Sequence, residues 1–124
     1  MSFCTAINCM DGRVQLPVIE YMKKKFTIDY VDMITEPGPN KILAEGSDDK
    51  LIESIFSRIE ISVKKHGSKH IAIICHFDCA GNPANEDEQW LHTLEAVKIV
   101  KERFKNTEVI GLWVNKNWDV TEIN

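Results

Sequence analysis

A chain of 124 residues can bury one core, and its 44% apolar and 27% charged residues are ordinary for a soluble globular protein. The net charge of -4 argues against nucleic acid or an anionic membrane surface as partner, and no stretch approaches the roughly 20 apolar residues of a membrane span. The start of the chain lacks the basic segment of a signal peptide, so we expect one cytoplasmic domain over residues 1–124, with reduced thiols.

The first half of the chain predicts two strands with a helix between them. The short apolar run from Phe3 to Asn8 predicts a strand, and apolar residues at helical spacing predict a helix from Leu16 to Lys25. A second strand is expected from Tyr30 to Thr35. The segment from Glu36 to Gly46 is expected to be a loop, because its prolines and glycines interrupt both helix and sheet.

The second half repeats the alternation. A helix capped by Ser47 is expected to end near Gly67, and the apolar run of residues 71–75 predicts a buried strand. Asn85 is expected to cap the next helix, whose predicted buried stripe contains Trp90, Leu91, Leu94, Val97 and Phe104. A strand at 108–114 and a short antiparallel edge strand at 119–123 follow. The alternation predicts a three-layer α/β fold, with a mostly parallel sheet covered by helices on both faces.

Two of the predicted strands end in residues that commonly bind metals. Cys9 follows the first strand, and His76 and Cys79 follow the strand of residues 71–75. Open α/β sheets bind ligands outside the carboxyl ends of their strands. If these two strands are neighbours, two sulfurs and one imidazole converge there and form a zinc site with one open position. The alternative is that the two thiols are structural and the histidine is an ordinary loop residue. This alternative is disfavoured, because thiols without a function are uncommon in exposed loops. Asp78 is expected either to support a neighbouring loop or to be solvated.

Asp11 and Arg13 lie in the loop that begins at Cys9. Arg13 is expected to make a bidentate contact with the Asp11 carboxylate, which keeps the carboxylate ionised and fixes its orientation. The alternative is a surface ion pair without a functional role. Asp11 then either accepts a proton from a zinc-bound water or itself ligates zinc and closes the fourth position. A thiolate phosphate-binding loop is rejected, because too few residues separate Cys9 from Arg13. Cys4 and Cys75 lie inside apolar runs and are expected to be small buried hydrophobes.

The segments Cys9-Met10-Asp11-Gly12-Arg13 and His76-Phe77-Asp78-Cys79 together resemble the C-x-D-x-R and H-x-x-C motifs of the β-class carbonic anhydrases. The resemblance spans nearly the whole chain, as a compact relative without the family's N-terminal helical arm. It implies strand order 2-1-3-4 with an antiparallel edge strand, zinc bound by Cys9, His76 and Cys79, and catalytic roles for Asp11 and Arg13. It also implies reversible hydration of CO₂ to bicarbonate by zinc-bound hydroxide, and a homodimer or higher even-numbered oligomer.

Two other functions remain open at this point. One is a non-catalytic zinc-binding or regulatory relative, favoured because the segment from Thr35 to Asn40 departs from the family pattern. The other is a zinc hydrolase of a CO₂ analogue such as COS or CS₂, since the same nucleophile can attack either molecule.

Overall fold

The computed structural model describes residues 1–123 and contains a five-stranded sheet of order β2-β1-β3-β4-β5. The strands are β1 (Phe3–Cys9), β2 (Tyr30–Glu36), β3 (His70–His76), β4 (Glu108–Val114) and β5 (Val120–Ile123). The first four run parallel to one another, and β5 pairs with β4 in the antiparallel sense. The predicted fold class, strand order and antiparallel edge strand are therefore confirmed.

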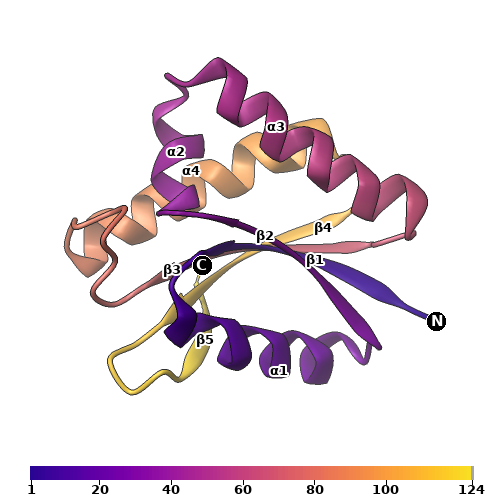
Figure 1. Ribbon diagram of the computed structural model, residues 1–124, viewed down its shortest axis with the longest axis horizontal. Coiled ribbons are helices and arrows are strands. Elements are labelled where there is room, and N and C mark those ends of the chain that lie inside the picture. Colours follow the sequence, from indigo (N-terminus) through magenta and orange to yellow (C-terminus); the bar gives the residue numbers. More distant parts are fainter. Residues whose placement is uncertain (124) are drawn as a thin grey trace.

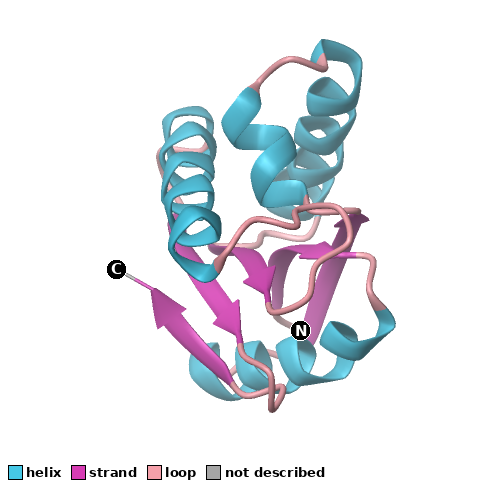
Figure 2. Cartoon of the chain, turned by 90° about the vertical axis from the view of Figure 1, so that its left-hand side faces the viewer, coloured by secondary structure: helices cyan, strands magenta, loops and turns pink. Residues whose placement is uncertain are grey.

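Helices cover both faces of the sheet (Figure 1). One face carries α1 (Gln15–Phe26), which a short 3₁₀ turn at Gly12–Val14 precedes. The other face carries α2 (Pro39–Glu45), α3 (Asp49–Glu60) and α4 (Glu86–Arg103) (Figure 2). A π-helical turn at Ile61–Lys65 extends α3. Within residues 1–123, no helix combines the length and apolar character that crossing a membrane requires.

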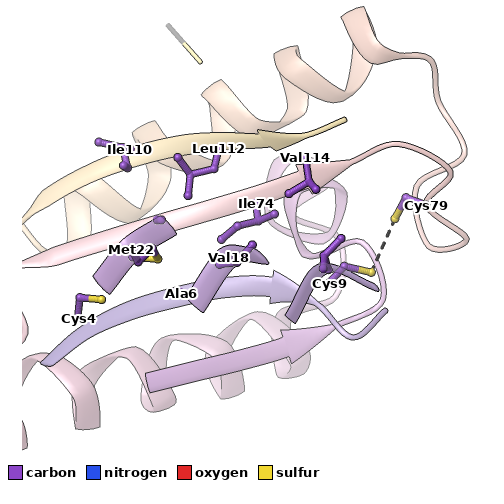
Figure 3. Close-up of a cluster of buried hydrophobic side chains, with 12 residues drawn as sticks. Cys4, Ala6, Cys9, Val18, Met22, Ile74, Cys79, Ile110, Leu112 and Val114 are labelled. Carbon is purple, nitrogen blue, oxygen red and sulfur yellow. Dashed lines mark hydrogen bonds between the residues drawn. The ribbon is translucent and has the colours of Figure 1, made fainter. Parts of the chain in front are cut away.

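The core lies on both sides of the sheet, as the near-continuous apolar strands require. On the α1 side, Val18 and Met22 pack with strand residues that include Ala6, Ile74 and Leu112 (Figure 3). On the other side, the buried cluster includes Ile7, Ile34, Ile55, Ile59, Ile73 and Val100. Cys4 in the first cluster and Cys75, which packs with Trp113 and Ile123, are buried free thiols, as predicted. Helices on both faces thus pack against β1 and β3 and position the carboxyl ends of these two strands.

The segment of residues 36–46 was expected to be a loop, but most of it is the helix α2. Pro39 sits in the first helical turn, where a missing N–H costs nothing and the fixed φ favours the helix. Gly38 precedes it with φ 62°, and Gly46 ends it with φ 66° while its N–H bonds to the Ile42 carbonyl. The prolines and glycines therefore delimit a short helix instead of excluding one.

Of the predicted buried stripe of α4, only Leu91 is wrong, since it is 67% exposed. Trp90, Leu94 and Val97 are partly buried against the core, and Phe104 is buried. The helix residues that are buried are Gln89, Thr93, Ala96 and Val100. Small and polar side chains here permit a close approach to the sheet and to α2. A Cβ added to Gly111 of β4 would lie 3.0 Å from Thr93 Cγ2, and Asn40 Nδ2 donates to Thr93 Oγ1 at 3.1 Å.

One of the two predicted helix caps is corrected. The N-cap of α3 is Asp48, whose Oδ1 accepts from the Leu51 N–H at 3.1 Å, and not the preceding Ser47. A carboxylate satisfies the same backbone donor as a hydroxyl and adds a favourable charge at the helix N-terminus. Asn85 caps α4 as predicted, since its Oδ1 accepts from the Glu88 N–H at 2.9 Å.

Candidate metal centre

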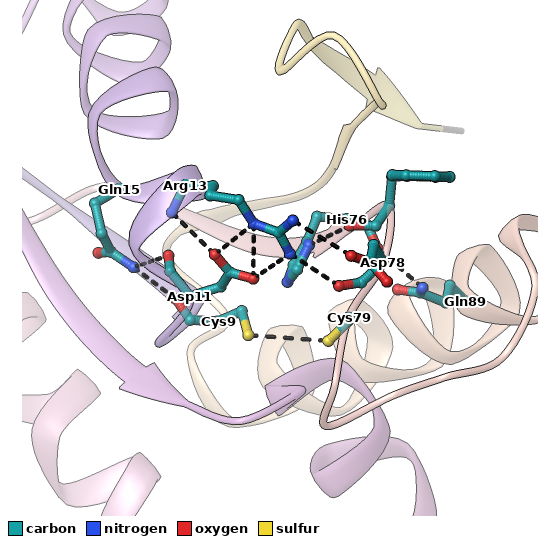
Figure 4. A network of polar contacts seen from close by, with 9 residues as sticks. Cys9, Asp11, Arg13, Gln15, His76, Asp78, Cys79 and Gln89 are labelled. Atoms are coloured by element: carbon teal, nitrogen blue, oxygen red, sulfur yellow. Dashed lines mark hydrogen bonds and ion pairs between the residues drawn. The ribbon is translucent and has the colours of Figure 1, made fainter.

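The carboxyl ends of β1 and β3 bring the two motifs together (Figure 4). The strands pair in parallel with Ile7 opposite Ile73, so Cys9 and His76 both lie at the carboxyl ends of their strands, on the same side of the sheet. The loop that follows β3 brings Cys79 back to these strand ends. The Cys9 and Cys79 sulfurs are 3.9 Å apart, and ligand atoms of all three residues lie within 4.8 Å of one another. The convergence expected from the sequence is therefore present in the structure.

This donor set fits a tetrahedral zinc ion. Two sulfurs bound at about 2.3 Å with tetrahedral angles would be about 3.8 Å apart, close to the observed spacing. The His76 side chain is fully buried, and its Nδ1 lies 2.7 Å from the Phe77 carbonyl, to which it can donate. Its buried Nε2 has no hydrogen-bond partner among residues 1–123. A metal ion would use this nitrogen, because a ligating imidazole usually donates its other N–H to a carbonyl or carboxylate.

The two thiols are strongly coupled. A hydrogen bond from Cys79 lowers the pKa of Cys9 to about 4, and the same contact together with burial raises the pKa of Cys79. Burial acts to lower the pKa of His76, but contacts with Cys9 and the Phe77 carbonyl outweigh it, and the net direction is upward. The protein groups alone thus favour one thiolate and one thiol, and a bound cation is what favours ionisation of both.

Two loops cross backbone against backbone beside the sulfurs. A Cβ on Gly81 would lie 2.3 Å from the Pro37 carbonyl carbon, and one on Gly38 would lie 2.7 Å from the Gly81 carbonyl carbon. The backbone N–H of Gly38 acts to lower the pKa of Cys9, and the backbone N–H groups of Gly81 and Asn82 act to lower the pKa of Cys79 against the net upward shift. These donors stabilise thiolate charge, and a side chain at either glycine would force the loops apart.

The predicted contact between Asp11 and Arg13 is present. Arg13 Nε donates to Asp11 Oδ1 at 3.0 Å, and Nη2 donates to Oδ2 at 2.7 Å. The Arg13 backbone N–H also donates to Oδ1 at 2.9 Å. The Arg13 side-chain bonds hold the pKa of Asp11 down to about 2, so the carboxylate is ionised at neutral pH. Asp78 contacts this loop, because its Oδ2 lies 3.3 Å from Arg13 Nη1.

A cavity of about 410 Å³ lies beside the candidate centre. Its walls include Phe77, Cys79, Gln89 and Trp113, together with the carboxylate residues Asp78 and Glu86. A space with aromatic walls and two acidic residues fits a small uncharged molecule better than an anion.

Comparison with known proteins agrees with this geometry. The whole chain, residues 1–124, matches the family model described as putative carbonic anhydrase. The chain belongs to the putative carbonic anhydrase family. No curated protein sequence matches it.

Solved β-carbonic anhydrase structures share the fold. The carbonic anhydrase of Streptococcus mutans has a TM-score of 0.64 at 17% identity, covering 97% of this chain and 81% of its own. The Trichomonas vaginalis β-carbonic anhydrase has a TM-score of 0.59 at 20% identity, covering 96% and 81%. A tetrameric β-carbonic anhydrase of Sordaria macrospora has a TM-score of 0.63 at 14% identity, covering 98% and 80%. At these identities, the likeness concerns the fold.

Two glutamines that were not predicted from the sequence hold the motif loops of this family member. Gln15 Nε2, at the start of α1, donates to the carbonyls of Cys9 at 2.7 Å and Asp11 at 3.0 Å. Gln89 Nε2, on the buried face of α4, donates to the His76 carbonyl at 2.9 Å. A buried glutamine four residues from Thr93 on the inner face of α4 is a signal that could have indicated such a role. Gln15 carries no signal beyond its nearness to Arg13.

Proposed function

We propose that this chain is a zinc-dependent carbonic anhydrase of the β class, a lyase that reversibly hydrates CO₂ to bicarbonate. The observation that carries the proposal is the convergence of Cys9, His76 and Cys79, with sulfurs 3.9 Å apart and an unpartnered imidazole nitrogen between the two motif loops. Membership of the putative carbonic anhydrase family supports the reaction type.

The residues of the chain divide the work between metal binding and proton handling. Cys9, His76 and Cys79 hold the zinc ion, which when bound supplies a water of lowered pKa as nucleophile. Asp11 is ionised at neutral pH and can accept a proton at its carboxylate. Arg13 orients Asp11 and occupies both carboxylate oxygens, which keeps them from the metal.

The surroundings support an uncharged substrate. The cavity beside Cys79 is lined by Phe77 and Trp113 and by the acidic residues Asp78 and Glu86. CO₂ is small and uncharged and enters such a space without an electrostatic penalty, whereas carboxylates disfavour retention of the bicarbonate product.

Metal content tests the ligand set. Elemental analysis of the purified protein is expected to find about one zinc ion per chain, and His76→Ala and Cys79→Ala are expected to lose it, because each removes a ligand. Cys75→Ala is the matched control, since it removes a buried thiol outside the cluster and is expected to retain zinc. Stoichiometric zinc in both His76→Ala and Cys79→Ala would contradict the assignment.

Stopped-flow hydration of CO₂ by the zinc-loaded protein tests the reaction. Hydration that depends on zinc supports the proposal. Full zinc binding without hydration at any pH would instead indicate a non-catalytic zinc-binding relative. Product analysis with COS and CS₂ separates a hydrolase of CO₂ analogues from a carbonic anhydrase.

We further infer that the chain assembles into a homodimer or a higher even-numbered oligomer. Met10 and Phe77 are exposed apolar side chains in the two motif loops, and Leu16 in the first turn of α1 is also exposed. Apolar surface at such a place is typical of protein contacts. The Sordaria macrospora protein, which shares the fold, is tetrameric.

A further inference from the structure

The Arg13 side chain contacts residues of three separate loops, and Figure 4 shows its contacts with Asp11 and Asp78. Asp11 comes from the loop after β1, and the Asp78 carbonyl, which accepts from Arg13 Nη2 at 3.1 Å, comes from the loop after β3. The third contact is with Trp118, in the turn between β4 and β5. The Arg13 Cζ atom lies 4.7 Å from the centre of the Trp118 ring. The guanidinium thus donates hydrogen bonds to two loops and lies over the Trp118 ring of the third.

Two of these contacts are made by residues in an unfavourable backbone conformation. Within residues 1–123, the residues other than glycine with positive φ are Thr27, Asp78 and Trp118. Two of the three, Asp78 with φ 57° and Trp118 with φ 63°, contact Arg13. Such strain persists only where the surroundings impose it, and it is commonly found at functional sites.

The turn that carries Trp118 is tightly bonded. Asn115 Oδ1 accepts from the N–H groups of Asn117 at 2.9 Å and Asp119 at 3.0 Å. The Trp118 N–H donates to the Asn115 carbonyl at 2.9 Å. None of these bonds involves Arg13, so the backbone of the turn is held by its own contacts.

We propose that Trp118 and the Asp78 carbonyl are positioning groups that hold the Arg13 guanidinium in one plane and thereby direct the Asp11 carboxylate. Arg13 is long and half-exposed, so the loss of side-chain entropy opposes a single orientation. Stacking on a ring fixes the plane while leaving every N–H free to donate. Asp11 is bonded to both Nε and Nη2, so rotation of that plane moves or releases the carboxylate. The effect on catalysis rests on the proposed function, whereas the positioning of Arg13 by Trp118 and the Asp78 carbonyl does not.

Two substitutions of Trp118 separate the ring from the turn. Trp118→Asn removes the ring but tolerates the left-handed backbone, and Trp118→Phe keeps a ring but not the indole. If Trp118 is needed only for the backbone of the turn, Trp118→Asn should have a smaller effect than Trp118→Phe. If the Trp118 ring positions Arg13, Trp118→Asn should be defective and Trp118→Phe should retain most of the wild-type behaviour.

The Arg13 Nε–H proton gives a direct readout, because this group donates to Asp11. Of the three arginines in the chain, Arg103 stacks on Phe56 at the same 4.7 Å and serves as an internal control. By NMR, Trp118→Asn is expected to speed exchange of the Arg13 Nε–H with water by about three- to tenfold, with Arg103 unchanged. Asp119→Asn, an exposed change in the same turn, is the matched control and is expected to leave exchange at Arg13 unchanged.

Kinetics of the zinc-loaded protein add the functional readout. Trp118→Asn is expected to lower kcat by about the same three- to tenfold with KM and zinc content unchanged, and Trp118→Phe is expected to restore most of it. Unchanged Arg13 exchange in Trp118→Asn, or equal defects in the asparagine and phenylalanine variants, would overturn the proposal. Absence of hydration in the wild type would refute the proposed function alone, because the NMR comparison does not require activity.

Discussion

Three donor groups of Arg13, the backbone N–H, Nε and Nη2, make hydrogen bonds to the Asp11 carboxylate. Arg13→Ala removes both side-chain donors, so Asp11 becomes free to turn toward the metal ligands of its own loop. We expect this variant to keep zinc and to lose about 10²–10⁴ in the rate of CO₂ hydration, the usual contribution of a positioned acid–base group. Asp11→Ala is expected to show a loss of the same order with zinc retained.

Zinc content and initial hydration rates across pH would be measured for both variants. Arg103→Ala is the control, since its guanidinium lies away from the candidate centre and pairs with Glu53. A wild-type rate in either Arg13→Ala or Asp11→Ala, with zinc bound, would show that the pair has no catalytic role.

The four cysteines are predicted to differ sharply in reactivity. Burial raises the pKa of Cys4 and of Cys75 to about 12, whereas the hydrogen bond from Cys79 lowers the pKa of Cys9 to about 4. At pH 8 a thiol of pKa 12 has a thiolate fraction of about 10⁻⁴, and the thiolate is the reactive form. After zinc is removed with a chelator, an alkylating reagent is therefore expected to modify Cys9 first, because Cys9 is the cysteine whose thiolate is populated at this pH.

Peptide mass spectrometry at successive times identifies which cysteine reacts. Cys4 and Cys75 are expected to react only in denaturant, which serves as the positive control for labelling. Modification of either buried thiol at the same rate as Cys9 in the folded protein would contradict their assignment as inert core residues.

At the scale of elements, the contact between the loops after β2 and β3 is the most sensitive to substitution. Gly81→Ala places a Cβ 2.3 Å from the Pro37 carbonyl carbon, and both neighbours are backbone, so no side chain can move aside. We expect a loss of about 1–3 kcal/mol in unfolding free energy, typical of overpacking. Weaker zinc binding is also expected, because the backbone N–H groups of Gly81 and Asn82 favour the thiolate form of Cys79.

Gly12→Ala is the matched control for stability, because a Cβ at Gly12 meets no atom within 4 Å. Denaturant unfolding of the metal-free proteins separates packing from zinc binding. Equal unfolding free energies for Gly81→Ala and Gly12→Ala would mean that the loops after β2 and β3 can move apart without loss of stability.

The strands β1, β3 and β4 were predictable because each is a mostly apolar run, and the candidate metal ligands were predictable because their spacing places them at strand ends. The helix α2 was missed since a seven-residue helix depends on packing more than on propensity. Its signal was Pro39 at the start and Gly46 just past the end. The position of Leu91 was wrong because close packing of α4 against α2 and β4 favours small residues at the contact. The contact between Gly38 and Gly81 links distant segments, which local patterns do not reveal.

At the scale of the whole molecule, assembly is the testable property. Phe77 is 47% exposed and Met10 is 62% exposed, and both lie in the motif loops. We expect light scattering to show an even-numbered oligomer, and Phe77→Asp to shift it toward monomer, because a buried charge at a contact is costly. Ile61→Asp, at the exposed end of α3, is the control. A wild-type monomer at high concentration would contradict the inferred assembly.

The separation of the candidate ligands along the chain has a consequence for how the protein folds. Cys9 and Cys79 are 70 residues apart and meet only when β1 and β3 are paired. In a zinc finger the ligands lie within a short local unit, so metal and local structure form together. Here a zinc ion would close a loop of more than half the chain, and that loop cannot close before the slow, non-local parallel pairing is complete. With zinc bound as proposed, its uptake during refolding would report the moment at which β1 and β3 pair.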